Sequence, residues 1–153
     1  MSNQPPPIPP QSQKILIVDD DAVIVRSLSM KLAANGYKVL TASEPSDAMQ
    51  SVRTEKPDLI LLDITFPPDV IGVSWDGFGV VEWMRRMNEE SAIPVIIITG
   101  GDSAKYKERA EAIGAAAFFN KPIQHDDLLK VISRTLAEWA SKSKPGSSAA
   151  KQA

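Results

Sequence analysis

The sequence predicts an α/β fold in which helices cover both faces of a five-stranded parallel sheet, a doubly wound (βα)5 arrangement. Three observations support this prediction. Short apolar runs alternate with longer segments whose apolar residues recur at helical spacing. The connections between most of these segments are short. A chain of 153 residues with 43% hydrophobic side chains is long enough to build one compact core.

Five short segments have the composition of strands buried on both faces, because they read as continuous apolar runs rather than as an alternation of apolar and polar residues. The expected strands span residues 14–18, 37–42, 58–62, 93–99 and 115–120. The third of them stops abruptly at Asp63, an acid that is a poor strand former and costly to bury without a partner.

Five amphipathic segments follow these strands in turn. In the first, Val25, Leu28 and Leu32 fall on one helical face, and Asn35-Gly36 ends the helix. The last has the longest apolar stripe, formed by Leu128, Ile132, Leu136 and Trp139. The expected helices lie within residues 19–36, 45–56, 78–90, 103–114 and 125–140.

Both ends of the chain lack this pattern. Residues 1–13 contain five of the twelve prolines and no hydrophobic periodicity, so we expect a disordered tail, with a proline-rich binding element as the alternative. Residues 140–153 are expected to form a second flexible tail. The folded domain is therefore expected to span residues 14–139.

Composition excludes several classes of function. Seventeen basic against nineteen acidic residues argue against a direct nucleic-acid binder and against a polybasic membrane anchor. The absence of cysteine excludes disulfides and thiol chemistry. The amino terminus does not resemble a signal peptide, and no apolar run reaches membrane-spanning length. We therefore expect a soluble, cytoplasmic protein.

Polar residues gather where the predicted strands end. The carboxyl ends of parallel strands share one edge of a sheet, so residues far apart in sequence meet there. Several carboxylates in one cleft repel unless a cation joins them, and oxygen ligands suit magnesium, with manganese as an alternative. Acids, a hydroxyl and a lysine around such an ion form a site for phosphoryl chemistry. The strand-end residues are Asp19, Asp20, Asp21, Asp63, Thr99, Gly100, Gly101, Asn120, Lys121 and Pro122.

Each of these residues also has an ordinary structural explanation. Asp20 or Asp21 is suited to cap the first helix. Thr99 alone is typical of a strand, and Lys121 alone is typical of a solvated surface. Their joint occurrence at the ends of alternating elements in one predicted sheet favours a functional site.

Four motifs carry a resemblance to a known family. The segments ILIVDDD, DLILLDITFP, PVIIITG and FFNKPIQHDDLL resemble the receiver domain of two-component response regulators over about residues 14–139, which implies the flavodoxin-like receiver fold. By this resemblance Asp63 accepts a phosphoryl group from a histidine kinase or a histidine phosphotransfer protein. Asp19, Asp20 and Asp63 would then hold Mg²⁺ together with the backbone carbonyl of Thr65.

The resemblance also implies a switch. Thr99 matches the hydroxyl residue that moves toward the phosphoryl group, Lys121 the lysine that pairs with that group, and Phe118 the aromatic residue that rotates. The bond between Lys121 and Pro122 is expected to be cis. Phosphorylation would change how a separate downstream protein binds. The chain is expected to be a stand-alone receiver with no enzyme activity beyond its own phosphorylation and dephosphorylation.

Two features depart from the family pattern or invite a second role. Eight residues, Pro68 to Trp75, separate Pro67 from Asp76-Gly77, where the family commonly has about two. We favour their folding back onto the domain over a partner contact or partial lid near Asp63. Unaltered kinase transfer and unaltered phosphoryl lifetime in Trp75→Ala would argue against the contact and the lid. His125, the only histidine, is interpreted as a solvated residue at a helix start rather than as a phosphorelay group.

Two other functions remain as alternatives. A haloacid-dehalogenase-like phosphatase also uses a strand-end aspartate with magnesium, but its second acid would stand at the position of Thr65. A receiver-shaped scaffold would bind partners without phosphorylation, and its binding would be unaffected by Asp63→Asn.

Overall fold

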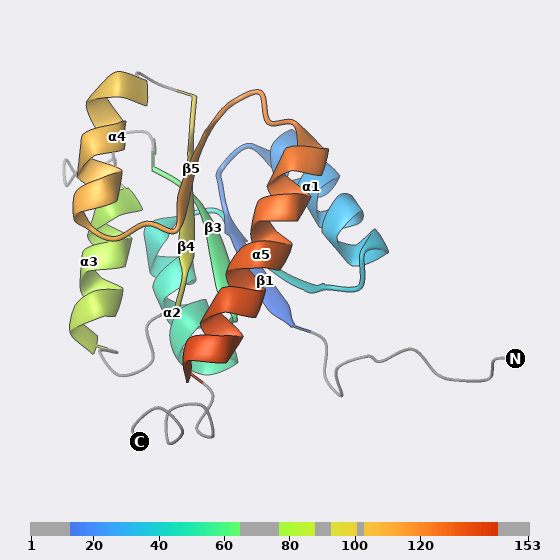
Figure 1. The fold of residues 1–153 in the computed structure, drawn as a ribbon, viewed down its shortest axis with the longest axis horizontal. Helices are drawn as coiled ribbons and strands as arrows, with labels where there is room; N and C mark the ends of the chain where they lie inside the picture. The colour runs from blue at the N-terminus through green and yellow to red at the C-terminus, as the bar shows by residue number, and fades with distance from the viewer. Residues whose placement is uncertain (1–12, 65–76, 88–92, 101–102, 144–153) are drawn as a thin grey trace, which may run out of the picture.

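The computed structural model describes residues 13–64, 77–87, 93–100 and 103–143. Strands and helices alternate from end to end of the described chain, as Figure 1 shows. The strands are β1 Lys14–Val18, β2 Lys38–Ala42, β3 Leu59–Asp63, β4 Val95–Thr99 and β5 Ala117–Asn120. The helices are α1 Ala22–Ala34, α2 Pro45–Glu55, α3 Gly77–Met87, α4 Ser103–Ala112 and α5 His125–Ser143. Residues 1–12, residues 144–153 and the segment 68–75 lie outside the described residues. Residues 140–143, which were predicted to begin the flexible tail, instead continue α5 to Ser143.

All strand pairs in the sheet are parallel, and the strand order is β2-β1-β3-β4-β5. Helices α1 and α5 cover one face, and α2, α3 and α4 cover the other (Figure 1). The prediction of a doubly wound five-stranded sheet is therefore confirmed. After β2 the chain returns past β1 to β3, so the strand order reverses between β1 and β3. In such sheets a crevice opens at this point, outside the carboxyl ends of the strands.

Two apolar layers hold the helices to the sheet. Successive strand residues point to opposite faces, so Ile15 and Ile17 of β1 pack toward α1 and α5, whereas Leu16 and Val18 pack toward the other helices. The helix residues predicted to point inward do so. Those that are buried are Leu28, Leu32, Ala48, Val52, Val80, Val81, Met84, Leu128, Ile132 and Leu136, while Val25 and Trp139 are half-buried.

The boundaries of β3 differ from the prediction. The strand begins at Leu59 rather than at residue 58, and it includes Asp63. Asp63 lies opposite Ile98 of β4, and the N–H of Ile64 donates to the carbonyl of Ile98 at 3.3 Å, so the pairing with β4 extends beyond the apolar run. The carboxylate is therefore held by the sheet itself, not by a loop.

Helix α1 begins with a side-chain cap. The carboxylate of Asp21 accepts hydrogen bonds from the N–H groups of Val23 at 3.0 Å and Ile24 at 3.3 Å. These are two of the N–H groups that a helix start leaves without an intrahelical partner. Asp21 is thus the acid that caps the helix, which leaves its two neighbours, Asp19 and Asp20, for other roles.

Arg85 ties α3 to the far end of α4. Its guanidinium donates to the carbonyls of Ile93, Ile113 and Gly114 at 3.4 to 3.5 Å. Ile113 and Gly114 follow the last residue of α4, where carbonyl groups lack intrahelical donors. One side chain thus connects α3, the approach to β4 and the carboxyl end of α4.

We predict that Asp21→Ala lowers the free energy of unfolding by about 1 kcal/mol, because two N–H groups at the start of α1 lose their acceptor. Urea unfolding followed by circular dichroism measures this change. Asp21→Ser keeps a capping oxygen, so its free energy of unfolding should lie within about 0.3 kcal/mol of the wild type. Equal losses in both variants would contradict the capping role.

Candidate functional site

The predicted site residues meet at the carboxyl edge of the sheet. Asp19 follows β1, Asp63 ends β3, Thr99 ends β4 and Lys121 follows β5. Asp19, Asp63 and Thr99 are buried, whereas Asp20 is exposed. The edge of the sheet at which the strand order reverses therefore brings together the acids, the hydroxyl and the lysine that the sequence singled out.

Lys121 bridges the two buried acids. Its ammonium Nζ lies 3.0 Å from Oδ2 of Asp19 and 3.2 Å from Oδ2 of Asp63. Its backbone N–H donates to the carbonyl of Thr99 at 2.9 Å, which fixes the start of the loop after β5 against the end of β4. The peptide bond between Lys121 and Pro122 is cis, as expected.

The charges of this cluster shift the ionisation of its members. Burial raises the pKa of Asp19 above its ordinary value; hydrogen bonds from the Asp21 backbone and from Lys121 oppose the rise, and the charge of Asp63 adds to it. For Lys121, burial acts to lower the pKa, but its bonds to Asp19 and the charges of Asp63 and Asp19 outweigh burial and raise it. The pairing of Lys121 with the two acids thus stabilises the fold fully at a pH below 10.5, the ordinary pKa of lysine. This contribution is lost as the pH rises through the higher pKa that Lys121 has in the folded protein.

Three carboxylates are placed to share a cation. Oxygen atoms of Asp19, Asp20 and Asp63 lie within 4.8 Å of one another. One ammonium against three carboxylates leaves two negative charges, which a divalent ion would balance. The donors are all oxygens, which fits Mg²⁺ or Mn²⁺ rather than a metal that prefers nitrogen or sulfur. The cluster is therefore compatible with Mg²⁺ binding.

Thr99 and Phe118 lie on the same face of the sheet. Phe118 is opposite Ile97 in the register of β4 and β5, and Ile97 and Thr99, two residues apart on one strand, point the same way. Phe118 is half-buried and packs against the core cluster beneath α2, α3 and α4. Ile97 is thus a neighbour of both Thr99 and Phe118 on this face of the sheet.

Some expectations fall outside the described residues, and one contact was not foreseen. Thr65, whose backbone carbonyl was expected to bind metal, and the whole segment 68–75 are not described. His125 is half-buried at the first residue of α5. The ion pair between Lys121 and Asp19 was missed, because the lysine was expected to pair with a phosphoryl group on Asp63. Only the three-dimensional structure shows that the side chain of Lys121 extends from the loop after β5 as far as Asp19.

Among the residues that the structure describes, we find no helix with the length and apolar character needed to span a bilayer.

Comparison with known proteins finds relatives over most of the chain. The family model described as response regulator receiver domain matches residues 15–133. Protein PilH of Pseudomonas aeruginosa is 36% identical over 124 residues, which are 81% of this chain and 98% of PilH. The alkaline phosphatase synthesis transcriptional regulatory protein PhoP of Bacillus subtilis is 35% identical over 111 residues, which are 72% of this chain and 43% of PhoP.

A solved structure shows the same arrangement. The CheY-like response regulator receiver domain protein from Methanospirillum hungatei superimposes with a TM-score of 0.77 at 28% identity, over 87% of this chain and 100% of that one.

We predict that Mg²⁺ stabilises the wild type and that Asp19→Asn and Asp20→Asn largely lose this effect. At a metal concentration one hundred times the dissociation constant, the gain in unfolding free energy should be about 2.7 kcal/mol. Urea unfolding with and without Mg²⁺ measures it. Asp21→Asn is the matched control, because it removes an adjacent acid while keeping a capping oxygen. A metal response in the control as weak as in the other two variants would argue against this ligand set.

Proposed function

The chain belongs to the family of response regulator receiver domains of two-component signalling, and on that premise we propose that a histidine kinase or a histidine phosphotransfer protein phosphorylates it on Asp63 in the presence of Mg²⁺. The observation that carries this proposal is the meeting of Asp63, two further acids and the Lys121 ammonium at one strand edge. Phosphorylation then changes how a separate target protein binds.

The geometry supports Asp63 as the nucleophile. A carboxylate oxygen of Asp63 attacks the phosphorus of a phosphohistidine, the phosphorus–nitrogen bond breaks, and the electron pair stays on the imidazole, which takes up a proton. The product is a mixed anhydride that water can later hydrolyse. The ammonium of Lys121, 3.2 Å from Oδ2 of Asp63, lies within reach of the new phosphoryl oxygens. Mg²⁺, when bound, would neutralise further charge on these oxygens.

Asp19 and Asp20 are suited to hold the metal rather than to attack. Asp19 has its other carboxylate oxygen engaged, because Oδ1 accepts the backbone N–H of Asp21 at 2.9 Å. Asp20 is exposed at the mouth of the crevice. We propose that the backbone carbonyl of Thr65 completes the protein's share of the ligands.

The switch follows from the charge added at Asp63. A phosphoryl group there presents acceptor oxygens that the hydroxyl of Thr99 can approach. Movement of Thr99 changes the space available to Phe118 on the same sheet face, which shifts the surface of α4, β5 and α5 between two arrangements. That surface is the proposed site of the change in partner binding.

The two alternatives make different predictions from this proposal. A scaffold would bind its partner equally well as wild type and as Asp63→Asn. A phosphatase would turn over phosphate esters, whereas receiver domains are signalling modules. Onward transfer of the phosphoryl group to a histidine phosphotransfer protein would distinguish a phosphorelay intermediate from a regulator that docks directly on a target.

We predict that incubation with acetyl phosphate and Mg²⁺ adds one labile phosphoryl group, seen by intact mass spectrometry, and that Asp63→Asn abolishes the adduct. Asp58→Asn is the matched control, because Asp58 lies just before β3, at the opposite end from Asp63. It should be phosphorylated like the wild type. If no adduct accumulates, a stable beryllofluoride complex would indicate rapid hydrolysis, and its absence would contradict the proposal.

We predict that Thr99→Val still accepts the phosphoryl group but responds to it less. Losing one hydrogen bond should shift the switch toward its resting arrangement by about two- to tenfold. Amide chemical shifts of α4, β5 and α5 with and without beryllofluoride measure this. Thr135→Val, which alters a buried threonine on α5, is the control for the loss of a buried hydroxyl. An undiminished response in Thr99→Val would contradict its role.

A further inference from the structure

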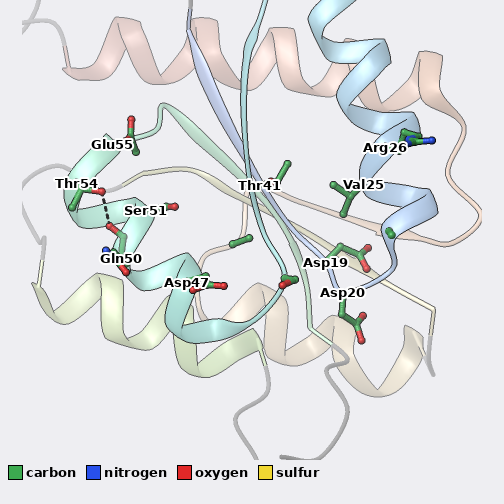
Figure 2. Close-up of a pocket in the computed structure, with 13 residues that line it drawn as sticks. Asp19, Asp20, Val25, Arg26, Thr41, Asp47, Gln50, Ser51, Thr54 and Glu55 are labelled. Atoms are coloured by element: carbon green, nitrogen blue, oxygen red, sulfur yellow. Dashed lines mark hydrogen bonds between the residues drawn. The ribbon is translucent and has the colours of Figure 1, made fainter.

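A groove runs beside β2, between α1 and α2. Its volume is about 650 Å³. One end reaches Asp19 and Asp20, and the remainder follows α2 away from the phosphoryl site. Figure 2 shows Thr41 of β2 between the two helices, with Arg26 on one side and the polar side chains of α2 on the other. Apart from Asp19 and Asp20 at that end, no residue that lines the groove has a role in the proposed phosphoryl chemistry.

The wall formed by α2 is polar. Ala48 and Val52 fill the buried side of this helix, so the side facing the groove carries residues at the complementary helical positions. The α2 residues that line the groove are Asp47, Gln50, Ser51, Thr54 and Glu55.

The lining is negatively charged. Asp47 and Glu55 lie along the α2 wall, and Asp19 and Asp20 add charge at one end. Arg26 is the basic residue among those that line the groove. The groove thus carries an excess of negative charge even where it leaves the metal cluster.

At the floor of the groove, Thr41 and Ala42 are the last two residues of β2. β2 is the last strand of the sheet on that side, and no described strand pairs with its outer edge. The N–H of Lys38 donates to Gln13 and the carbonyl of Ala42 accepts from Asp19, so the polar groups of these alternate residues face β1. Along a strand these groups alternate in direction, so those of Val39 and Thr41 face outward.

We propose that the groove binds an extended, basic segment of a partner protein as an added strand on β2. The outward N–H and C=O groups of Val39 and Thr41 would pair with the backbone of the segment, and its basic side chains would face Asp47 and Glu55. Backbone pairing supplies affinity in this mode of recognition, and the flanking side chains supply selectivity.

The charge of the groove and the polarity of its wall argue against other occupants. A nucleic acid would be repelled, because its phosphates carry the same sign as the lining. A helix would present no free backbone groups to the edge of β2 and would need an apolar wall, whereas the α2 wall is polar. An extended basic chain can pair with the outward backbone groups of β2 and can neutralise the acidic lining.

A direct test uses a short peptide of alternating lysine and threonine with both ends blocked. We expect binding to the full chain, with Val39 and Thr41 amides protected from hydrogen exchange. A version with methyl groups on the amide nitrogens that would face β2 should not bind, because it cannot donate to the strand edge. The double variant Asp47→Asn/Glu55→Gln should bind about tenfold more weakly.

The matched control is Glu108→Gln/Glu111→Gln, which removes two exposed acids from α4 and leaves the groove unchanged. Circular dichroism checks that both double variants are folded. Equal weakening in both pairs, equal binding of the methylated peptide, or no binding to the wild type would overturn the proposal. Phosphorylation with acetyl phosphate should be normal in both double variants, so a failure of the phosphoryl proposal would be seen separately.

Discussion

The arrangement of this molecule depends on the placing of two buried carboxylates beside one ammonium. Asp19, which follows β1, and Asp63, which ends the neighbouring strand β3, are each 3% exposed, and a buried charge without a partner is costly. Lys121, carried by the loop after β5, contacts both. The pairing therefore requires β1, β3 and β5 to end at the same level, which the parallel register of the sheet provides.

The negative charge of this cluster is only partly neutralised by Lys121. Asp20 adds a third carboxylate, and burial together with the charge of Asp63 raises the pKa of Asp19 despite two favourable hydrogen bonds. Without a metal, ionised Asp19 is thus held less favourably than an ordinary aspartate. A divalent ion bound between these carboxylates would relieve the repulsion between them, and the proposed phosphorylation site lies in the same cluster.

Local pattern was enough to predict much of the fold and the site, because both depend on short-range features. The apolar run Leu59–Leu62 and the acid after it located the strand and the carboxylate at its end. What depends on three-dimensional arrangement was not predicted. Side-chain geometry decided that Asp21 caps α1 and that Lys121 contacts Asp19. The roles of Thr65, Thr99 and Phe118 came from the family resemblance, and the groove was missed because alternation of strands and helices does not show that β2 is an edge.

Arg85 has a mechanical consequence for α4, which forms part of the proposed output surface. Its guanidinium holds the carbonyls of Ile113 and Gly114, so the carboxyl end of α4 is fastened to α3. The amino end of α4 lies instead near the carboxyl edge of the sheet, just beyond Thr99. Because Arg85 holds the carboxyl end of α4, any displacement of this helix would be largest at its amino end, beside the acids.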